Sequence, residues 1–272
     1  MRLKTYRASA LLLLAGLLFS TPPSVYALAI ANSEIAFSNL QITPSAGTVQ
    51  FLDPWTAQAF AQASNSLGQR EQSFNASVGG VAGAAAMVTF AQGHSTASAV
   101  NLTASAASNV NIPAGGFTAS SVGLGTLFNT SFMITGVTGD VQVNFLANIL
   151  GSLDVFTDLL GLRAETETIF TLLVDGVSVL FSQHLLSIGS NSADNLSFFE
   201  TLFGTLLLPS NTPIFIPAQV DSESMAINVP EPSTITLLLA GLGVLAGFAK
   251  KRAKGKRLTP VNHEPMDRCQ GS

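Results

Sequence analysis

The strongest constraint on this chain is an uncharged apolar run, residues 234–249, with two prolines shortly before it and a group of lysines after it. A helix of that length reaches about 24 Å, slightly less than the roughly 30 Å hydrocarbon core of a bilayer. Pro230 and Pro232 keep the residues before them out of helical geometry, so we expect the helix to start at or after Ser233. The run therefore predicts one short C-terminal transmembrane helix.

A dense basic cluster follows the apolar run and gives it a direction. Its members are Lys250, Lys251, Arg252, Lys254, Lys256 and Arg257. Their long stems can lie along the end of the helix while the charged groups remain with phosphates and water. Because positive flanks stay cytoplasmic, we expect residues 258–272 to form a cytoplasmic tail and everything before Val229 to lie across the membrane.

Residues 229–257 resemble the PEP-CTERM sorting signal. The resemblance rests on Val229, Pro230, Glu231, Pro232 and Ser233, on the short glycine-containing apolar run, and on the basic cluster. It implies recognition by an exosortase, a membrane-embedded cysteine transpeptidase of Gram-negative bacteria that cuts near the motif and releases or transfers its substrate. The tail departs from such signals, which usually end soon after the basic residues. The alternative is a plain membrane anchor with an incidental proline pair.

The N-terminus has the three parts of a secretory signal peptide. Three cations lie within the first seven residues, an apolar core covers 8–19, and Val25-Tyr26-Ala27 fits a cleavage site that ends at Ala27. We therefore expect residues 1–27 to be removed by signal peptidase after passage through the secretion machinery.

Residues 28–228 are expected to form one exported domain. The chain's single cysteine, Cys269, lies outside this region, so neither disulfides nor cysteine chemistry are available to the domain. It holds two cations, Arg70 and Arg163, against thirteen carboxylates, a net charge of −11. Such a surface repels nucleic acid and anionic lipid, and it favours neutral polymers or cations as partners.

The clearest local signal in the domain is a β-hairpin at Asp175-Gly176, a pair suited to a type I′ turn. The flanking strands are 168–174 and 177–181. A two-residue loop pairs Val174 with Val177, Leu172 with Val179 and Phe170 with Phe181, which predicts an apolar core face.

Further alternation predicts more strands. Residues 132–135 and 141–145 are expected to form a second hairpin across 136–140, and 222–227 a last strand that leads into the sorting signal. Residues 73–125 are rich in alanine, glycine, serine and threonine, which favours thin, closely packed strands. The spacing predicts a mainly β domain, an antiparallel and jelly-roll-like β-sandwich.

One helix is also expected in the domain. Asp53-Pro54 suits a cap and first position, Trp55, Ala59 and Ala63 then share one side, and Gly68 would end the helix.

Few residues of the domain suit catalysis or metal binding. His94 falls in a predicted turn, and His184 continues the hairpin strand, where a structural histidine is more common than a catalytic base. Oxygen ligands for a calcium ion are offered by Asp154, Asp158, Glu165 and Glu167. The alternative interpretation, that these carboxylates are solvated and keep the domain soluble, is more common than calcium binding. We expect no enzyme activity and no required cofactor.

The function expected is that of an exported, non-enzymatic surface or extracellular-matrix protein, held briefly at the inner membrane and then processed by exosortase. The resemblance implies association with exopolysaccharide and biofilm. Two alternatives remain open. A carbohydrate-active enzyme would need two carboxylates near one cleft, and a self-assembling, amyloid-like matrix protein would use residues 73–125.

Overall fold

The computed structural model describes residues 28–113, 117–158 and 162–228, and every regular element in those ranges is a β-strand. The strands are β1 (Leu28–Pro44), β2 (Thr48–Phe51), β3 (Thr56–Asn65), β4 (Arg70–Val78), β5 (Val81–Val88), β6 (Ala91–Ser98), β7 (Thr103–Pro113), β8 (Thr118–Thr135), β9 (Asp140–Thr157), β10 (Leu162–Val174), β11 (Val177–Ile188), β12 (Ser192–Pro209) and β13 (Ile214–Asn228). The expected signal peptide, sorting signal and cytoplasmic tail lie outside the described residues.

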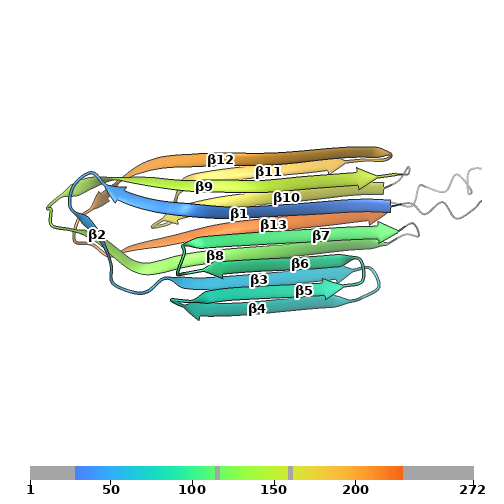
Figure 1. The fold of residues 1–272 in the computed structure, drawn as a ribbon, viewed down its shortest axis with the longest axis horizontal. Coiled ribbons are helices and arrows are strands. Elements are labelled where there is room, and N and C mark those ends of the chain that lie inside the picture. The colour runs from blue at the N-terminus through green and yellow to red at the C-terminus, as the bar shows by residue number, and fades with distance from the viewer. Residues whose placement is uncertain (1–27, 114–116, 159–161, 229–272) are drawn as a thin grey trace, which may run out of the picture. The chain divides into compact units, whose positions relative to one another are not determined.

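The strands form two antiparallel sheets that lie face to face (Figure 1). The six-stranded sheet has the order β12-β9-β1-β7-β6-β5, and the other has the order β11-β10-β13-β8-β3-β4, with β2 paired to β8. Their inner faces share a large hydrophobic core and a second, small cluster around Ala31, Val155 and Ala164. The mainly β, antiparallel prediction is confirmed, and the stacking is sandwich-like. The jelly-roll-like connectivity stays a prediction.

The core has a bulky half and a thin half. In the bulky half, Phe37 of β1 packs on Phe170 of β10 with ring centroids 5.3 Å apart. In the thin half, alternate residues of β3, from Ala57 to Ala63, are fully buried alanines. A Cβ added to Gly93 of β6 would lie 2.2 Å from the carbonyl oxygen of Val122 in the opposite sheet. The two backbones therefore nearly touch there, which only small inner residues permit.

The Asp175-Gly176 turn is confirmed, since both residues have positive φ, 47° and 81°. The predicted pair Val174–Val177 forms, and Leu173–Ser178 follows it. The register then shifts, because Val179 is left over before the pair Leu172–Leu180, so the predicted pairs Leu172–Val179 and Phe170–Phe181 are wrong. This bulge turns Leu180 inward and leaves Phe181 54% exposed, so the predicted core position of Phe181 is wrong.

The predicted helix after Asp53-Pro54 is wrong, because the strand β3 occupies that segment. Buried alanines recur there at every second residue, and such a series also contains the four-residue spacing of Ala59 and Ala63. A helix would bury Ala59 and Ala63 together, whereas a strand also buries Ala57 and Ala61 on the same face. Gln58 and Phe60 lie on the outer face, as a period of two requires.

The predicted hairpin across residues 136–140 is also wrong. The strands that flank it, β8 and β9, belong to different sheets, so the loop crosses from one sheet to the other. Residues 132–135 of β8 pair with β2, and farther from the loop β8 lies between β13 and β3, so β8 is an inner strand of its own sheet. Gly136 and Gly139, with φ of 83° and 87°, let the backbone leave the plane of the sheet.

The described chain begins and ends at the same end of the two sheets (Figure 1). At this end Leu28 starts β1, next to the end of β9, where Ala29 pairs with Thr157. Asn228 ends β13 opposite Leu162, the first residue of β10. Residues before and after the domain therefore attach at one common end.

Candidate functional site

The sorting segment begins where the strand β13 ends. This strand lies between β10 and β8 and is paired on both sides as far as Ile227. The predicted recognition residues, Val229 to Ser233, the helix 234–249 and the basic cluster lie outside the described residues, as does Ala27. The structure therefore gives the sorting segment a firmly held starting point and describes nothing beyond it.

A network of buried hydroxyl groups holds the last part of β13 in place. The Ser222 Oγ lies 2.7 Å from the Ser33 Oγ of β1, and the Ser224 Oγ lies 2.7 Å from the Ser108 Oγ of β7. The Thr166 hydroxyl of β10 is 2.9 Å from that of Ser224. Because these bonds join both sheets within six residues of Asn228, a pull on the following segment is resisted by the core.

The four candidate calcium ligands are not brought together. Asp154 is on the outer face of β9 and Asp158 just follows it, whereas Glu165 and Glu167 are on β10 in the other sheet. An Asp158 Oδ1 accepts a 2.6 Å hydrogen bond from the Leu28 amide. Within the described ranges no three histidine, cysteine or acidic residues are placed to hold a metal ion.

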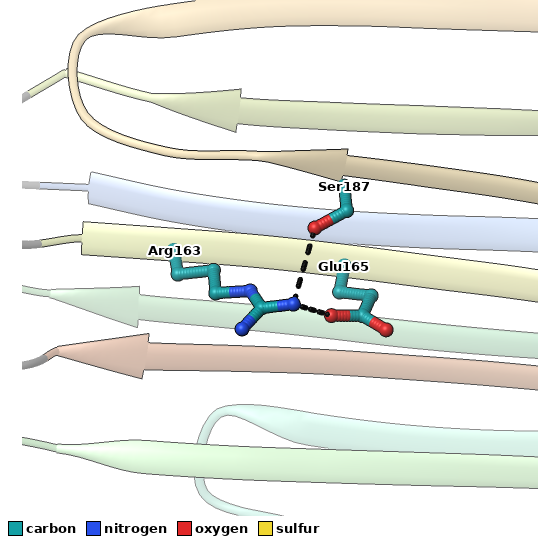
Figure 2. Close-up of polar contacts among 3 residues, drawn as sticks. All are labelled: Arg163, Glu165 and Ser187. Atoms are coloured by element: carbon teal, nitrogen blue, oxygen red, sulfur yellow. Dashed lines mark hydrogen bonds and ion pairs between the residues drawn. The ribbon is translucent and has the colours of Figure 1, made fainter.

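Glu165 is engaged by a cation (Figure 2). Its Oε2 lies 2.6 Å from the Arg163 guanidinium, which also lies 3.4 Å from the Ser187 hydroxyl of β11. The Arg163 side chain is 54% exposed, so solvent screens this ion pair and it contributes little stability. It leaves Glu165 less able to bind a metal.

An acidic row on the outer face of β13 was not singled out in the sequence. Asp221 and Glu223 both point outward, and Glu223 pairs directly with Glu167 of β10. Burial raises the pKa of Asp221 from 3.8 to about 7, with Glu223 and Glu167 adding to the rise against a backbone hydrogen bond from Ser222. The alternation of β13 could have revealed this row, but not the burial of Asp221.

His184 is held by structural contacts between β11 and β12. Its Nε2 lies 3.2 Å from the Ser182 hydroxyl and 3.1 Å from Glu200 Oε1, and its ring stacks on Phe198. In a serine–histidine–acid site the serine and the acid use opposite ring nitrogens. Here both contact the same nitrogen, and Ser182 donates its proton to Glu200, so the geometry differs from that of such a site. His94 is exposed on β6, and the predicted turn there is wrong.

A long apolar row on β12 was also missed. The exposed fractions of Phe199, Phe203 and Leu207 are 69%, 65% and 63%. Thr201 and Thr205 alternate with them and donate hydrogen bonds to Asn148 and Asn144 of β9. We call these five β12 residues the outer row. Adjacent pairs such as Phe198-Phe199 hide the period of two, so the sequence does not show which member points outward.

Comparisons with known proteins identify the sorting segment. A family model for the PEP-CTERM protein-sorting motif matches residues 228–253. The chain carries a PEP-CTERM sorting motif. The motif is that of exported proteins targeted to an exosortase, so the predicted resemblance is confirmed. The match starts at the last residue of β13 and leaves the exported domain unassigned.

The exported domain lies outside the residues that the sorting-motif model matches. No curated protein matches the chain. A crystal structure of the 7S globulin of Momordica charantia is similar over 75% of this chain and 70% of that one, with 9% identity and a TM-score of 0.11. A likeness of that size carries no argument about fold or function. Within its described residues the chain has no helix long and apolar enough to cross a membrane.

Proposed function

We propose that this protein is a non-enzymatic component of the cell surface or extracellular matrix, delivered by the PEP-CTERM route and associated with exopolysaccharide. The PEP-CTERM motif directly after β13 carries this proposal. The signal peptide takes residues 28–228 across the inner membrane. The helix 234–249 then holds the domain there until an exosortase acts near Pro230, Glu231 and Pro232.

The arrangement of the chain ends supports this route. Leu28 and Asn228 lie at one end of the two sheets, so that end faces the membrane whichever flanking segment holds the domain (Figure 1). Only Val229 separates Asn228 from Pro230, so an exosortase that acts at the motif works next to the end of the domain. Cutting near the motif removes no described strand.

The charge of the domain supports a polymer as partner. A net charge of −11 with only Arg70 and Arg163 as cations disfavours binding to acidic polymers. Neutral or weakly charged polysaccharide therefore suits this surface better than nucleic acid or anionic lipid. The matrix role rests on this charge and on the delivery route.

The test replaces Pro230 and Pro232 together with alanine in the native host. We expect the wild-type protein to be shortened and recovered in the matrix fraction, and to leave that fraction when the polysaccharide is degraded. The variant should keep its full C-terminus and stay in the membrane fraction, because alanine lets the helix extend into the recognition segment. Electrophoresis and immunoblotting of cell fractions measure both outcomes.

The matched control replaces Pro260 and Pro265 with alanine, two prolines in the tail beyond the basic cluster. This control should be processed as the wild type is. Unchanged processing of the Pro230 and Pro232 variant would contradict the exosortase route. A processed protein found only in the medium would contradict the matrix role and leave the route intact.

A further inference from the structure

The strand β12 has a free edge along its whole length. Its eighteen residues pair with β9 from Ser192 to Pro209, and among the described strands no other pairs with β12. In Figure 1 it forms one border of the six-stranded sheet. Unpaired backbone groups on a long edge are a template for another strand, so a free edge of this length needs an explanation.

The opposite border of the same sheet is protected by side chains. The Glu71 carboxylate of β4 accepts a 3.2 Å hydrogen bond from the Met87 amide of β5, and the Gln69 side chain accepts one from the Thr89 amide. Asn75 donates to the Gly83 carbonyl oxygen. These contacts occupy edge groups of β5 that another chain would need. On β12 the Asn195 amide donates a 2.9 Å hydrogen bond to the Asp194 side chain, whereas among the described residues no side chain hydrogen-bonds to the β12 backbone between Ser197 and Pro209.

The outer row is complementary to itself in an antiparallel pairing centred on Phe203. In that register Phe203 faces Phe203 of a second copy, Thr201 faces Thr205, and Phe199 faces Leu207. Each apolar residue thus meets an apolar residue and each threonine meets a threonine, which are favourable cross-strand pairs. A β12 strand that only ended the sheet, without binding a second copy, would not need side chains arranged symmetrically about Phe203.

Charge also allows a second copy to approach here. Between Leu196 and Pro209 the only ionisable residue is Glu200, and its carboxylate faces Ser182 and His184 of β11. Elsewhere a domain with a net charge of −11 repels its copies. This border is therefore a place where two copies can meet without opposing like charges directly.

We propose that two copies of this protein associate through their β12 strands, in antiparallel register about Phe203, and form one continuous twelve-stranded sheet. The pairing covers residues 197–209, about 45 Å at ~3.4 Å per residue. With a border about 15 Å wide this buries roughly 600–700 Å² per copy, at the lower end of the range for specific interfaces. A dissociation constant in the micromolar range is expected. The inference is independent of the proposed matrix role.

The first test measures the mass of residues 28–228, whose core is complete in itself, by sedimentation equilibrium between about 1 and 200 μM. The wild-type domain should become dimeric across this range. Phe203→Lys puts like charges opposite each other at the two-fold axis and should weaken association by at least about 30-fold. The matched control is Phe74→Lys on β4, a border strand of the other sheet, where the phenylalanine is 64% exposed; this variant should dimerise as the wild type does.

The second test fixes the register by oxidation of single-cysteine variants, since the domain has no cysteine of its own. Phe203→Cys should form a disulfide-linked dimer, because directly opposed residues lie close enough. Leu207→Cys should not link to itself but should link to Phe199→Cys in a mixture. A wild-type domain that stays monomeric at 200 μM overturns the proposal, as does equal self-linking of Leu207→Cys. A monomer that binds soluble exopolysaccharide through Phe203 would also overturn it, in favour of a glycan on the outer row.

Discussion

At the scale of single residues, Asp221 is the most unusual group of the exported domain. Its Oδ1 is buried without a hydrogen-bond partner among the described residues, and Glu223 and Glu167 lie near it. All three effects favour the neutral acid, so the pKa of Asp221 rises to about 7. In the unfolded chain the same group ionises near its ordinary value of 3.8.

This difference predicts a pH dependence of stability. Because the folded state holds the Asp221 proton more tightly, the stabilisation is complete below pH ~4 and is lost as the pH rises towards ~7. Asp221→Asn keeps the shape without the charge, and we expect it to raise the free energy of unfolding at pH 8 by about 1–3 kcal/mol. At pH 4 the change should be small. Urea denaturation at both pH values measures the difference.

The control for this prediction is Asp154→Asn, which removes an exposed carboxylate from the outer face of β9. It should change the stability equally little at both pH values. If Asp221→Asn destabilises the domain at pH 8 as much as at pH 4, the carboxyl group is stabilised as an anion and the account of its burial is wrong.

At the scale of elements, strand positions were more predictable than strand partners. Alternation located the β10–β11 turn and the last strand, because a period of two is a local property. It did not locate the extra residue Val179, since a bulge depends on what packs against β11. The link between β8 and β9 was mistaken for a hairpin because a short glycine loop looks the same whether it stays in one sheet or crosses to another.

The close approach of β6 and β8 gives a second prediction. Gly93→Ala would place a Cβ 2.2 Å from the Val122 carbonyl oxygen and 2.8 Å from that of Gln62, both in the opposite sheet. The backbones must separate to admit it, so we expect a loss of about 3 kcal/mol or more in the free energy of unfolding. Thermal and urea denaturation of residues 28–228 measure this loss.

The control is Gly83→Ala on the neighbouring strand β5, where the nearest atoms lie 3.9 Å from the added Cβ. That change should be neutral or stabilising by up to about 1 kcal/mol, because alanine restricts the unfolded chain more than glycine does. Equal tolerance of both substitutions would show that the two sheets lie farther apart than described.

At the scale of the whole molecule, the sequence reveals delivery more clearly than activity. The sorting motif can be recognised in the sequence because its parts are contiguous. The outer row and the acidic row cannot be recognised in this way, because their positions depend on which residues each strand turns outward. Asp154, Asp158, Glu165 and Glu167 show the limit of sequence spacing: they lie within fourteen residues and yet fall on two sheets. A site whose residues are brought together by tertiary packing can be located only once the fold is known.

The delivery route requires that both flanking segments leave one end of the domain and are absent from the finished protein. Mass spectrometry of the termini of the exported protein, purified from its native host, tests this most directly. We expect a chain that begins at Leu28 and ends close to Pro232, with no peptide from residues 234–257. A mature protein that still contains the apolar run and the basic cluster would contradict it.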